Sequence, residues 1–370
     1  MTGRNVSHLG KRGGEMLSPL LAQVRHNCHL ASSAQAGYYS LCGFLLRLRA
    51  LYKWEQGWPP WREPEPEAVL EWVAGVESAW EALEDAPLAD LEVQEETFGP
   101  FEIEALNARL QSLGLAYGAG YTRGLAPTFF LGELLERRQE DGLTILILGD
   151  EWARDLDGTP ALRQGSLIYA RRQALEYYLW DRLSDPAQQG DARVAAALAA
   201  FGLELHRLVA DPERYREGFR DLAAVELETY IRHEIGEAQD TELGEAFPLL
   251  LELFPQTRIE LWLRGLKDAL ADVHEAGRLA YIIERRLLAS AALFFAFQPG
   301  LYPLLLPEVN AVSCRLLAGD WQALAAARQA ARDRLAAEAA QVRELTLALA
   351  DTPARLGKEL SRRFLAPLGL

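Results

Sequence analysis

Four polar side chains share one face of a helix predicted over residues 212–239. Glu226, Tyr230, His233 and Glu237 follow one another at steps of four, three and four residues. At 100° per residue these steps keep them within about 40° of one another. Carboxylates, an imidazole and a phenol in one stripe have the donor atoms to ligate a divalent metal or to carry protons. This acidic stripe therefore predicts a candidate metal site, with Glu226, His233 and Glu237 as ligands.

The segment from His233 to Glu237 also resembles part of the zinc-peptidase pattern H-E-x-x-H, with glutamate in place of the second histidine. In that pattern Glu234 is the candidate base, and Tyr230 is the second catalytic candidate. Tyrosine at 230 also removes the Glu-x-x-His pair that dimetal helical bundles require. The sequence thus leaves a mononuclear site open, whose remaining ligands come from other helices. Candidates for these ligands are Glu176 and His274.

The acidic stripe has a simpler interpretation as the solvated face of an amphipathic helix. Its apolar residues, among them Leu227 and Ile231, lie on the other side of the helix. Tyr230 argues against this interpretation, because a large amphipathic ring usually buries its body. Gly236 in the same helix costs about 1 kcal/mol relative to alanine and indicates close backbone packing or a local break.

A basic stripe is predicted on a helix over residues 256–297. It consists of Lys267, His274, Arg278, Tyr281 and Arg285. It is a candidate to bind a small anion without a metal, through Lys267 and Arg278, or to face the acidic stripe in a buried polar seam. Separate solvated faces with local ion pairs are the favoured alternative. Arg123, in a glycine-rich segment that lacks the helix of a phosphate loop, is a third candidate anion ligand.

The pattern of apolar residues predicts a mainly α-helical chain. Residues 1–15 are expected to form a disordered tail, 16–158 an N-terminal helical region, and 159–370 an all-α helical bundle. A small antiparallel β-meander is expected near residues 115–149, because β-rich runs there are separated by turn residues that include Asp141-Gly142. No sheet is expected after residue 160.

Net charge, hydropathy and cysteine content exclude or disfavour some classes of protein. A formal net charge of −15 and a pI of about 5.0 make the protein acidic and argue against nucleic-acid binding. The most apolar run, 287–297, is shorter than the roughly 20 residues that cross a bilayer, so no membrane partner is predicted. Three cysteines without a C-x-x-C pair favour a reducing compartment, and residues 1–15 lack the apolar core of a signal peptide. The sequence predicts a cytoplasmic protein.

Two segments carry a resemblance to a known family. YSLCGFLLRLRALYKWEQG (39–57) and GAGYTRGLAPTFFLGELLERR (118–138) resemble an uncharacterised bacterial family of cytoplasmic proteins of unknown function. The resemblance covers most of the chain after Met16 and implies no catalytic residues.

Three function classes follow from these patterns. Because no motif is specific, a helical binding or scaffold protein is favoured. The alternatives are a metal-dependent enzyme that uses the acidic stripe, and a metal-free small-anion binder or enzyme that uses the basic stripe. The partner would be a small anionic ligand or another protein, and the oligomeric state is not predicted.

Overall fold

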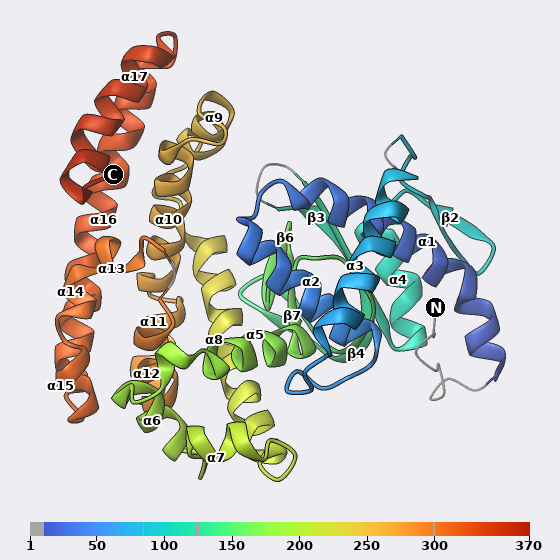
Figure 1. The fold of residues 1–370 in the computed structure, drawn as a ribbon. Helices are drawn as coiled ribbons and strands as arrows, with labels where there is room; N and C mark the ends of the chain where they lie inside the picture. Colours follow the sequence, from blue (N-terminus) through green and yellow to red (C-terminus); the bar gives the residue numbers. More distant parts are fainter. Residues whose placement is uncertain (1–10, 84, 123–125, 299) are drawn as a thin grey trace. The chain divides into compact units, whose positions relative to one another are not determined.

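The computed structural model describes residues 11–83, 85–122, 126–298 and 300–370 (Figure 1). The chain forms two compact units: unit 1 ends at Asp181, and unit 2 runs from Arg182 to Leu370. This division lies later in the chain than the predicted boundary at 158–159. Helix α1 begins at Lys11, so residues 11–15 of the expected disordered tail are helical, while residues 1–10 lie outside the described part.

Unit 1 places its helices around a β-sheet. The helices are α1 (Lys11–Ala36), α2 (Leu41–Glu55), α3 (Pro66–Glu81), α4 (Ile103–Leu110) and α5 (Arg172–Ser184). Helix α1 packs against strands β4 and β5, and its Leu20 and Val24 join a core that includes Phe129. The apolar side of α1 is thus buried by the sheet.

The sheet is larger than the predicted meander. It contains β3 (Leu115–Tyr121), β4 (Pro127–Glu140), β5 (Leu143–Arg154), β6 (Ala161–Gln164) and β7 (Leu167–Arg171) in the order β3-β4-β5-β7-β6. The three strands that were predicted are present. Asp141 and Gly142, both at positive φ, form the turn between β4 and β5. A separate hairpin pairs β1 (Leu91–Val93) with β2 (Glu96–Phe98).

Two expectations about the sheet are wrong. Strands β6 and β7 lie after residue 160, and β7 pairs in parallel with β5, so the sheet is mixed rather than antiparallel. Both strands are short, and β7 continues directly into α5. A strand of four or five residues that leads into a helix is too short for its alternating pattern to be distinguished from the pattern of the helix. The chain from 159 onward is therefore not all α.

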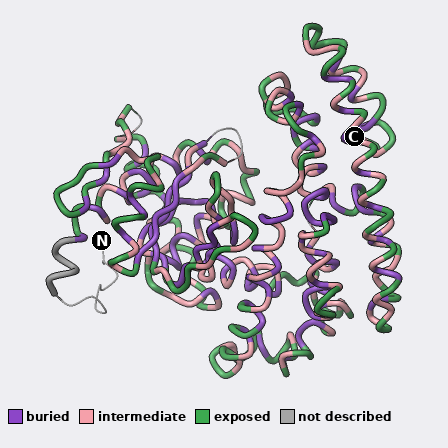
Figure 2. The backbone as a smooth tube through the Cα atoms, turned by 180° about the vertical axis from the view of Figure 1, so that it is seen from behind, coloured by how far each residue is buried: buried purple, intermediate pink, exposed green. Residues whose placement is uncertain are grey.

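The described part of unit 2 contains helices and turns and no strand. Its helices are α6 (Ala192–Ala199), α7 (Leu205–Ala210), α8 (Arg216–Gln239), α9 (Ala246–Leu253), α10 (Arg258–Val273), α11 (Arg278–Arg285), α12 (Leu288–Ala296), α13 (Tyr302–Leu305), α14 (Pro307–Asn310), α15 (Ser313–Leu317), α16 (Trp321–Leu349) and α17 (Pro353–Leu360). Buried positions recur along these helices between exposed ones (Figure 2). The buried positions of α9 to α17 build one core, in which Leu266 and Leu270 of α10 and Leu335 of α16 are fully buried.

Two predicted helices differ in their limits. Helix α8 begins at Arg216 rather than at 212, because residues 212–215 form turns before it. The helix predicted over 256–297 is three helices. Helix α10 ends at His274, where the chain turns before α11, and Arg286 in the left-handed conformation ends α11. The basic stripe is consequently divided between α10 and α11.

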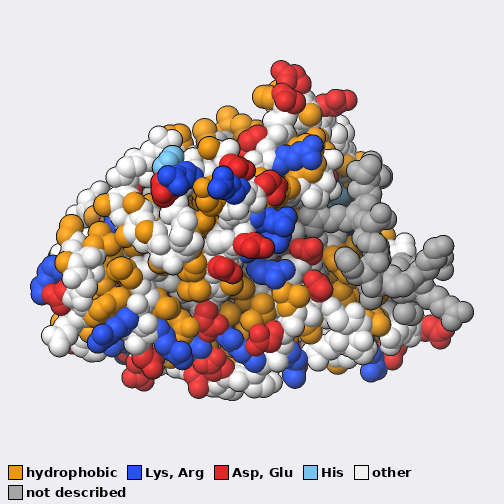
Figure 3. All heavy atoms as spheres, turned by 90° about the horizontal axis from the view of Figure 1, so that it is seen from below, with side chains coloured by type: hydrophobic (Ala, Val, Ile, Leu, Met, Phe, Trp, Pro, Cys, Tyr) orange, Lys and Arg blue, Asp and Glu red, His pale blue; other side chains and the backbone are white. Residues whose placement is uncertain are grey.

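Two features of the composition can be compared with the structure: the charged residues and the apolar runs. On the face drawn in Figure 3, acidic and basic side chains lie next to one another among apolar ones. None of the described helices is long and apolar enough to span a membrane.

Candidate metal centre

Helices α8 and α10 approach closely at Gly236. A Cβ atom at this position would overlap the carbonyl oxygen of Ala271 and lie 2.9 Å from the Cα of Gly277. Only glycine therefore allows this contact. Of the two explanations predicted for Gly236, the structure shows close backbone packing within an unbroken helix. The contact brings the side chains of neighbouring turns on the two helices within reach of each other.

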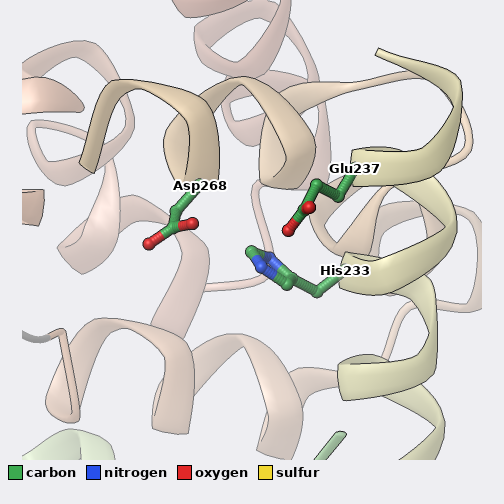
Figure 4. Close-up of side chains that lie close together, drawn as sticks. All are labelled: His233, Glu237 and Asp268. Atoms are coloured by element: carbon green, nitrogen blue, oxygen red, sulfur yellow. The ribbon is translucent and has the colours of Figure 1, made fainter. Parts of the chain in front are cut away.

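Three potential ligands meet beside this contact. His233 and Glu237 extend from α8 and Asp268 extends from α10 toward a shared space (Figure 4). One ligand atom from each lies within 4.8 Å of the others, and all three residues are half-buried. An imidazole and two carboxylates supply one nitrogen and two oxygen donors, a set that first-row divalent metals accept.

A fourth residue fixes the imidazole. Asp272, one turn after Asp268 on α10, has its Oδ1 2.8 Å from Nδ1 of His233. The hydroxyl of Tyr302 donates to Oδ2 of the same carboxylate at 2.9 Å. Because Asp272 engages Nδ1, the other ring nitrogen, Nε2, is left as the metal donor. Metal-binding histidines commonly have this carboxylate partner behind them.

The charges in the cluster perturb one another. Burial lowers the pKa of His233, but the charge of Asp272 and its hydrogen bond outweigh burial and raise that pKa to about 10. Burial, with the neighbouring charges of Glu237 and Asp272, raises the pKa of Asp268 to about 6 despite the opposing effect of His233. The pKa of Asp272 is lowered, since His233 and Tyr302 outweigh its burial. His233 is therefore protonated at neutral pH and supplies a positive charge to the cluster. A metal ion would have to displace this proton in order to bind the ring nitrogen.

The acidic and basic stripes face each other in unit 2. The ammonium of Lys267 lies 2.6 Å from Oε1 of Glu237, and the guanidinium of Arg278 lies 3.4 Å from Oε2 of Glu226. The favoured interpretation as separate solvated faces is therefore wrong at these positions, and the stripes form a polar seam. Arg278 also covers the ring of Tyr230, with 4.5 Å from its Cζ to the ring centroid.

Two predicted ligands in unit 2 are not in the cluster. Glu226 is fully buried two turns before His233 on α8, where burial raises its pKa and Arg278 pairs with it. His274 caps α10, and its Nδ1 accepts a hydrogen bond from the backbone nitrogen of Ala276 at 3.1 Å. Burial, followed by the charge of Arg332, lowers the pKa of His274.

The remaining candidates lie elsewhere. Glu176 lies on α5, among the residues of unit 1, and is not one of the three clustered residues. Arg123 lies outside the described residues. The two catalytic candidates lie on α8: Glu234 is buried and not among the three clustered ligands, and Tyr230 contacts Arg278 through its ring.

Asp268 and Asp272 were missed by sequence reasoning. They stand four residues apart on α10, the same spacing as His233 and Glu237 on α8. Two helices that each present an i, i+4 pair across one close contact give four convergent side chains. The spacing of the aspartates was a usable signal, but Lys267 next to Asp268 gave that helix the appearance of a basic surface.

The two units correspond to two family domains. Residues 19–171 match the N-terminal domain, and residues 176–362 match the C-terminal domain, of a family of unknown function (DUF6866). The chain belongs to this family. The resemblance to an uncharacterised family is thus confirmed, and the family assigns no function. No curated protein and no solved structure gave a significant match.

Proposed function

We propose that the C-terminal unit binds a divalent metal ion through His233, Glu237 and Asp268, and that the protein is a metal-dependent enzyme. The observation that carries the proposal is the convergence of these three ligand atoms within 4.8 Å. They come from two long helices that are held together by the contact at Gly236. Ligands on rigid elements need little rearrangement to bind.

The donor set supports a first-row metal with an accessible position. One imidazole and two carboxylates favour zinc, manganese or iron(II) over calcium or magnesium, which prefer oxygen donors alone. Three protein ligands leave at least one position for water or substrate, as in catalytic zinc sites, whereas structural zinc sites usually have four protein ligands. The side chains of His233 and Glu237 are each 19% exposed, so they are only partly enclosed by the fold.

The competing interpretation is a structural ion network. In such a network each acid is held by a cation, as Glu226 is by Arg278. The centre differs in its balance of charge. Glu237 pairs with Lys267, and Asp272 pairs with His233. Asp268 is a third carboxylate beside these two pairs, and its pKa is raised to about 6. The crowding of acids supports a cation at this point. A helical binding or scaffold role stays a prediction.

Metal analysis combined with thermal melting tests the proposal. A metal that binds only the folded chain stabilises it by about 2.7 kcal/mol at a hundredfold excess over Kd. The wild type should therefore melt higher with manganese or zinc. His233→Ala and Glu237→Gln should lose this shift, each compared with its own metal-free form. His206→Ala, whose side chain is 75% exposed on α7, is the matched control and should keep it.

The comparison within each variant matters, because His233→Ala leaves the buried Asp272 without its imidazole partner and lowers the stability of the metal-free protein. The proposal fails if the wild type shows no metal-dependent shift, or if Glu237→Gln keeps the full shift. Elemental analysis of the purified protein gives the identity of the metal.

The compartment is part of the same proposal. Cys28, Cys42 and Cys314 are all free thiols, which supports a reducing compartment such as the cytoplasm. The net charge of −15 supports a partner other than nucleic acid. Zinc, manganese and iron are all available in such a compartment.

A further inference from the structure

We propose that Lys267 and the open metal position together bind the oxyanion group, phosphoryl or carboxylate, of a small anionic ligand. This inference rests on the proposed metal site and names its substrate class. It combines the metal hypothesis with the small-anion hypothesis. The reason is that Lys267 of the basic stripe contacts Glu237, a proposed metal ligand of the acidic stripe.

The position of Lys267 supports a role beside the metal. It precedes Asp268 on α10, and its ammonium reaches Oε1 of Glu237 at 2.6 Å. One lysine thus borders ligands from both helices. Its ammonium also lies 4.5 Å from the ring centroid of Phe247, which restricts where the side chain can point.

Exposure distinguishes Lys267 from the other cation of the seam. The side chain of Lys267 is 26% exposed, whereas that of Arg278 is 13% exposed and is packed over Tyr230. Arg278 faces Glu226, which is buried away from the metal ligands. Lys267 is therefore the more exposed of the two cations, and it is the one that contacts a residue of the three-ligand cluster.

Metal binding changes the charge around Lys267. A divalent ion balances the carboxylates of Glu237 and Asp268, and His233 then binds through its neutral form. The charge of Glu237 is shared with the metal, so its attraction for the ammonium of Lys267 weakens. An oxyanion bound to the metal restores a negative partner for that ammonium. Carboxylate and phosphoryl oxygens both form strong charge-assisted hydrogen bonds with lysine.

Solvent proton relaxation of the manganese-loaded chain is a direct test. Manganese(II) with bound water enhances this relaxation, and an oxyanion that displaces the water reduces it. The full chain, loaded with manganese, is titrated separately with inorganic phosphate and with acetate. Equilibrium dialysis in the same buffers shows how much manganese stays bound.

The wild type should show a saturable fall in relaxation with phosphate or acetate while manganese stays bound. Lys267→Met should raise the apparent Kd of that anion about tenfold or more, which corresponds to the loss of one charge-assisted hydrogen bond. Lys358→Met is the matched control, because Lys358 is exposed on α17, and it should bind the anion as the wild type does. The anion with the lower Kd identifies the group that the site prefers.

Failure of the two proposals can be told apart. If manganese does not bind the wild type, the metal site itself is wrong, and the oxyanion site falls with it. If manganese binds but neither anion displaces water, or if Lys267→Met binds the anion as well as the wild type, the metal site stands and the oxyanion site is overturned. A fall in relaxation that matches loss of manganese in dialysis also overturns it.

Discussion

The two units bury ionisable side chains in opposite ways. In unit 1, Arg171 and Glu151 are both fully buried and form an ion pair at 2.5 Å, and Arg154 lies 3.4 Å from the other oxygen of Glu151. Arg171 also donates to the backbone carbonyls of Asp157 and Thr159. In unit 2 the cluster around His233 is half-buried and contains several acids.

This difference separates a structural network from a candidate binding site. The charges of unit 1 alternate in sign and are enclosed by strands and loops, so they hold neighbouring segments in one arrangement. In unit 2, His233, Glu237 and Asp268 are half-buried and place one ligand atom each within 4.8 Å of the others. Burial and unusual pKa values occur in both, so neither identifies function by itself. The feature that indicates a binding site is the convergence of several ligand atoms on one point.

The largest effect is expected from breaking the enclosed pair of unit 1. Arg171→Met removes the closer of the two arginines that pair with Glu151 and leaves this fully buried carboxylate with Arg154 alone, which should lower the free energy of unfolding by about 3 to 5 kcal/mol. The double variant Arg171→Met with Glu151→Gln removes both charges and should recover part of the loss. Denaturant unfolding measures both.

The surface pair of Arg109 and Glu96 provides the matched control in the same unit. Both side chains are about half exposed. Arg109→Met should leave the unfolding midpoint nearly unchanged, because exposed pairs are screened by water and salt. If Arg171→Met is as mild as this control, the enclosed network does not stabilise the fold, and the contrast between the units is lost.

A second effect of unit 1 depends on pH. Asp155 is fully buried and accepts hydrogen bonds from the backbone nitrogens of Phe129 and Asp157. Burial, followed by the charge of Asp157, raises the pKa of Asp155 from 3.8 to about 6. The folded state thus holds the proton more tightly than the unfolded state, and the stability from this group is complete below pH 3.8. It is lost as the pH rises to about 6.

The expected size is up to about 3 kcal/mol, since one unit of pKa corresponds to about 1.4 kcal/mol. Other carboxyls also titrate in this range, so the measured quantity is the difference between the wild type and Asp155→Asn, whose amide does not titrate. Unfolding is measured at several pH values from 4 to 7. The stability of the wild type relative to the variant should fall with rising pH. A constant or rising difference would show that Asp155 has an ordinary or lowered pKa.

The fold could be predicted where the signal was local. The strands β3, β4 and β5 were found because the Asp141-Gly142 turn and the β-forming runs lie next to each other in the sequence. Strands β6 and β7 were not found, because they are short and depend on tertiary pairing: β7 pairs with β5, and β6 pairs with β7. The end of α10 was also missed. The apolar period predicts a helix that continues past residue 273, but His274 caps α10 and its Nδ1 accepts a hydrogen bond from the backbone nitrogen of Ala276.

The site shows the same limit. His233 and Glu237 were predicted as ligands because both lie on one helix, whose period the sequence contains. Asp268 and Asp272 come from a second helix, and the register of α8 on α10 depends on the tertiary contact at Gly236. The sequence indicated either close packing or a local break at that glycine, and it did not show which helix the glycine meets. The sequence did not show which two helices pack together, and this was the information needed to predict the complete set of ligands.

The smallest effect expected, and the sharpest test of the contrast, concerns how Asp272 and Tyr302 position His233. If the unit 2 cluster binds a metal, these residues hold Nδ1 of the imidazole and direct Nε2 to the ion. Asp272→Asn keeps the shape but removes the charge, and it should weaken metal binding by about 10- to 100-fold. Tyr302→Phe removes a hydrogen bond one step further away, so its effect should be smaller. Asp333→Asn, at an exposed position on α16, is the control.

Competition titrations with a metal indicator give the affinities, and the visible spectrum of the cobalt(II)-loaded protein reports the geometry around the ion. A purely structural Asp272 would lower stability when replaced but leave the metal affinity and the cobalt spectrum of the folded protein unchanged. A positioning Asp272 changes both, and Tyr302→Phe changes them in the same direction. A loss that is largest for Asp272→Asn, smaller for Tyr302→Phe and absent for the control Asp333→Asn would follow the hydrogen-bonded path to the imidazole.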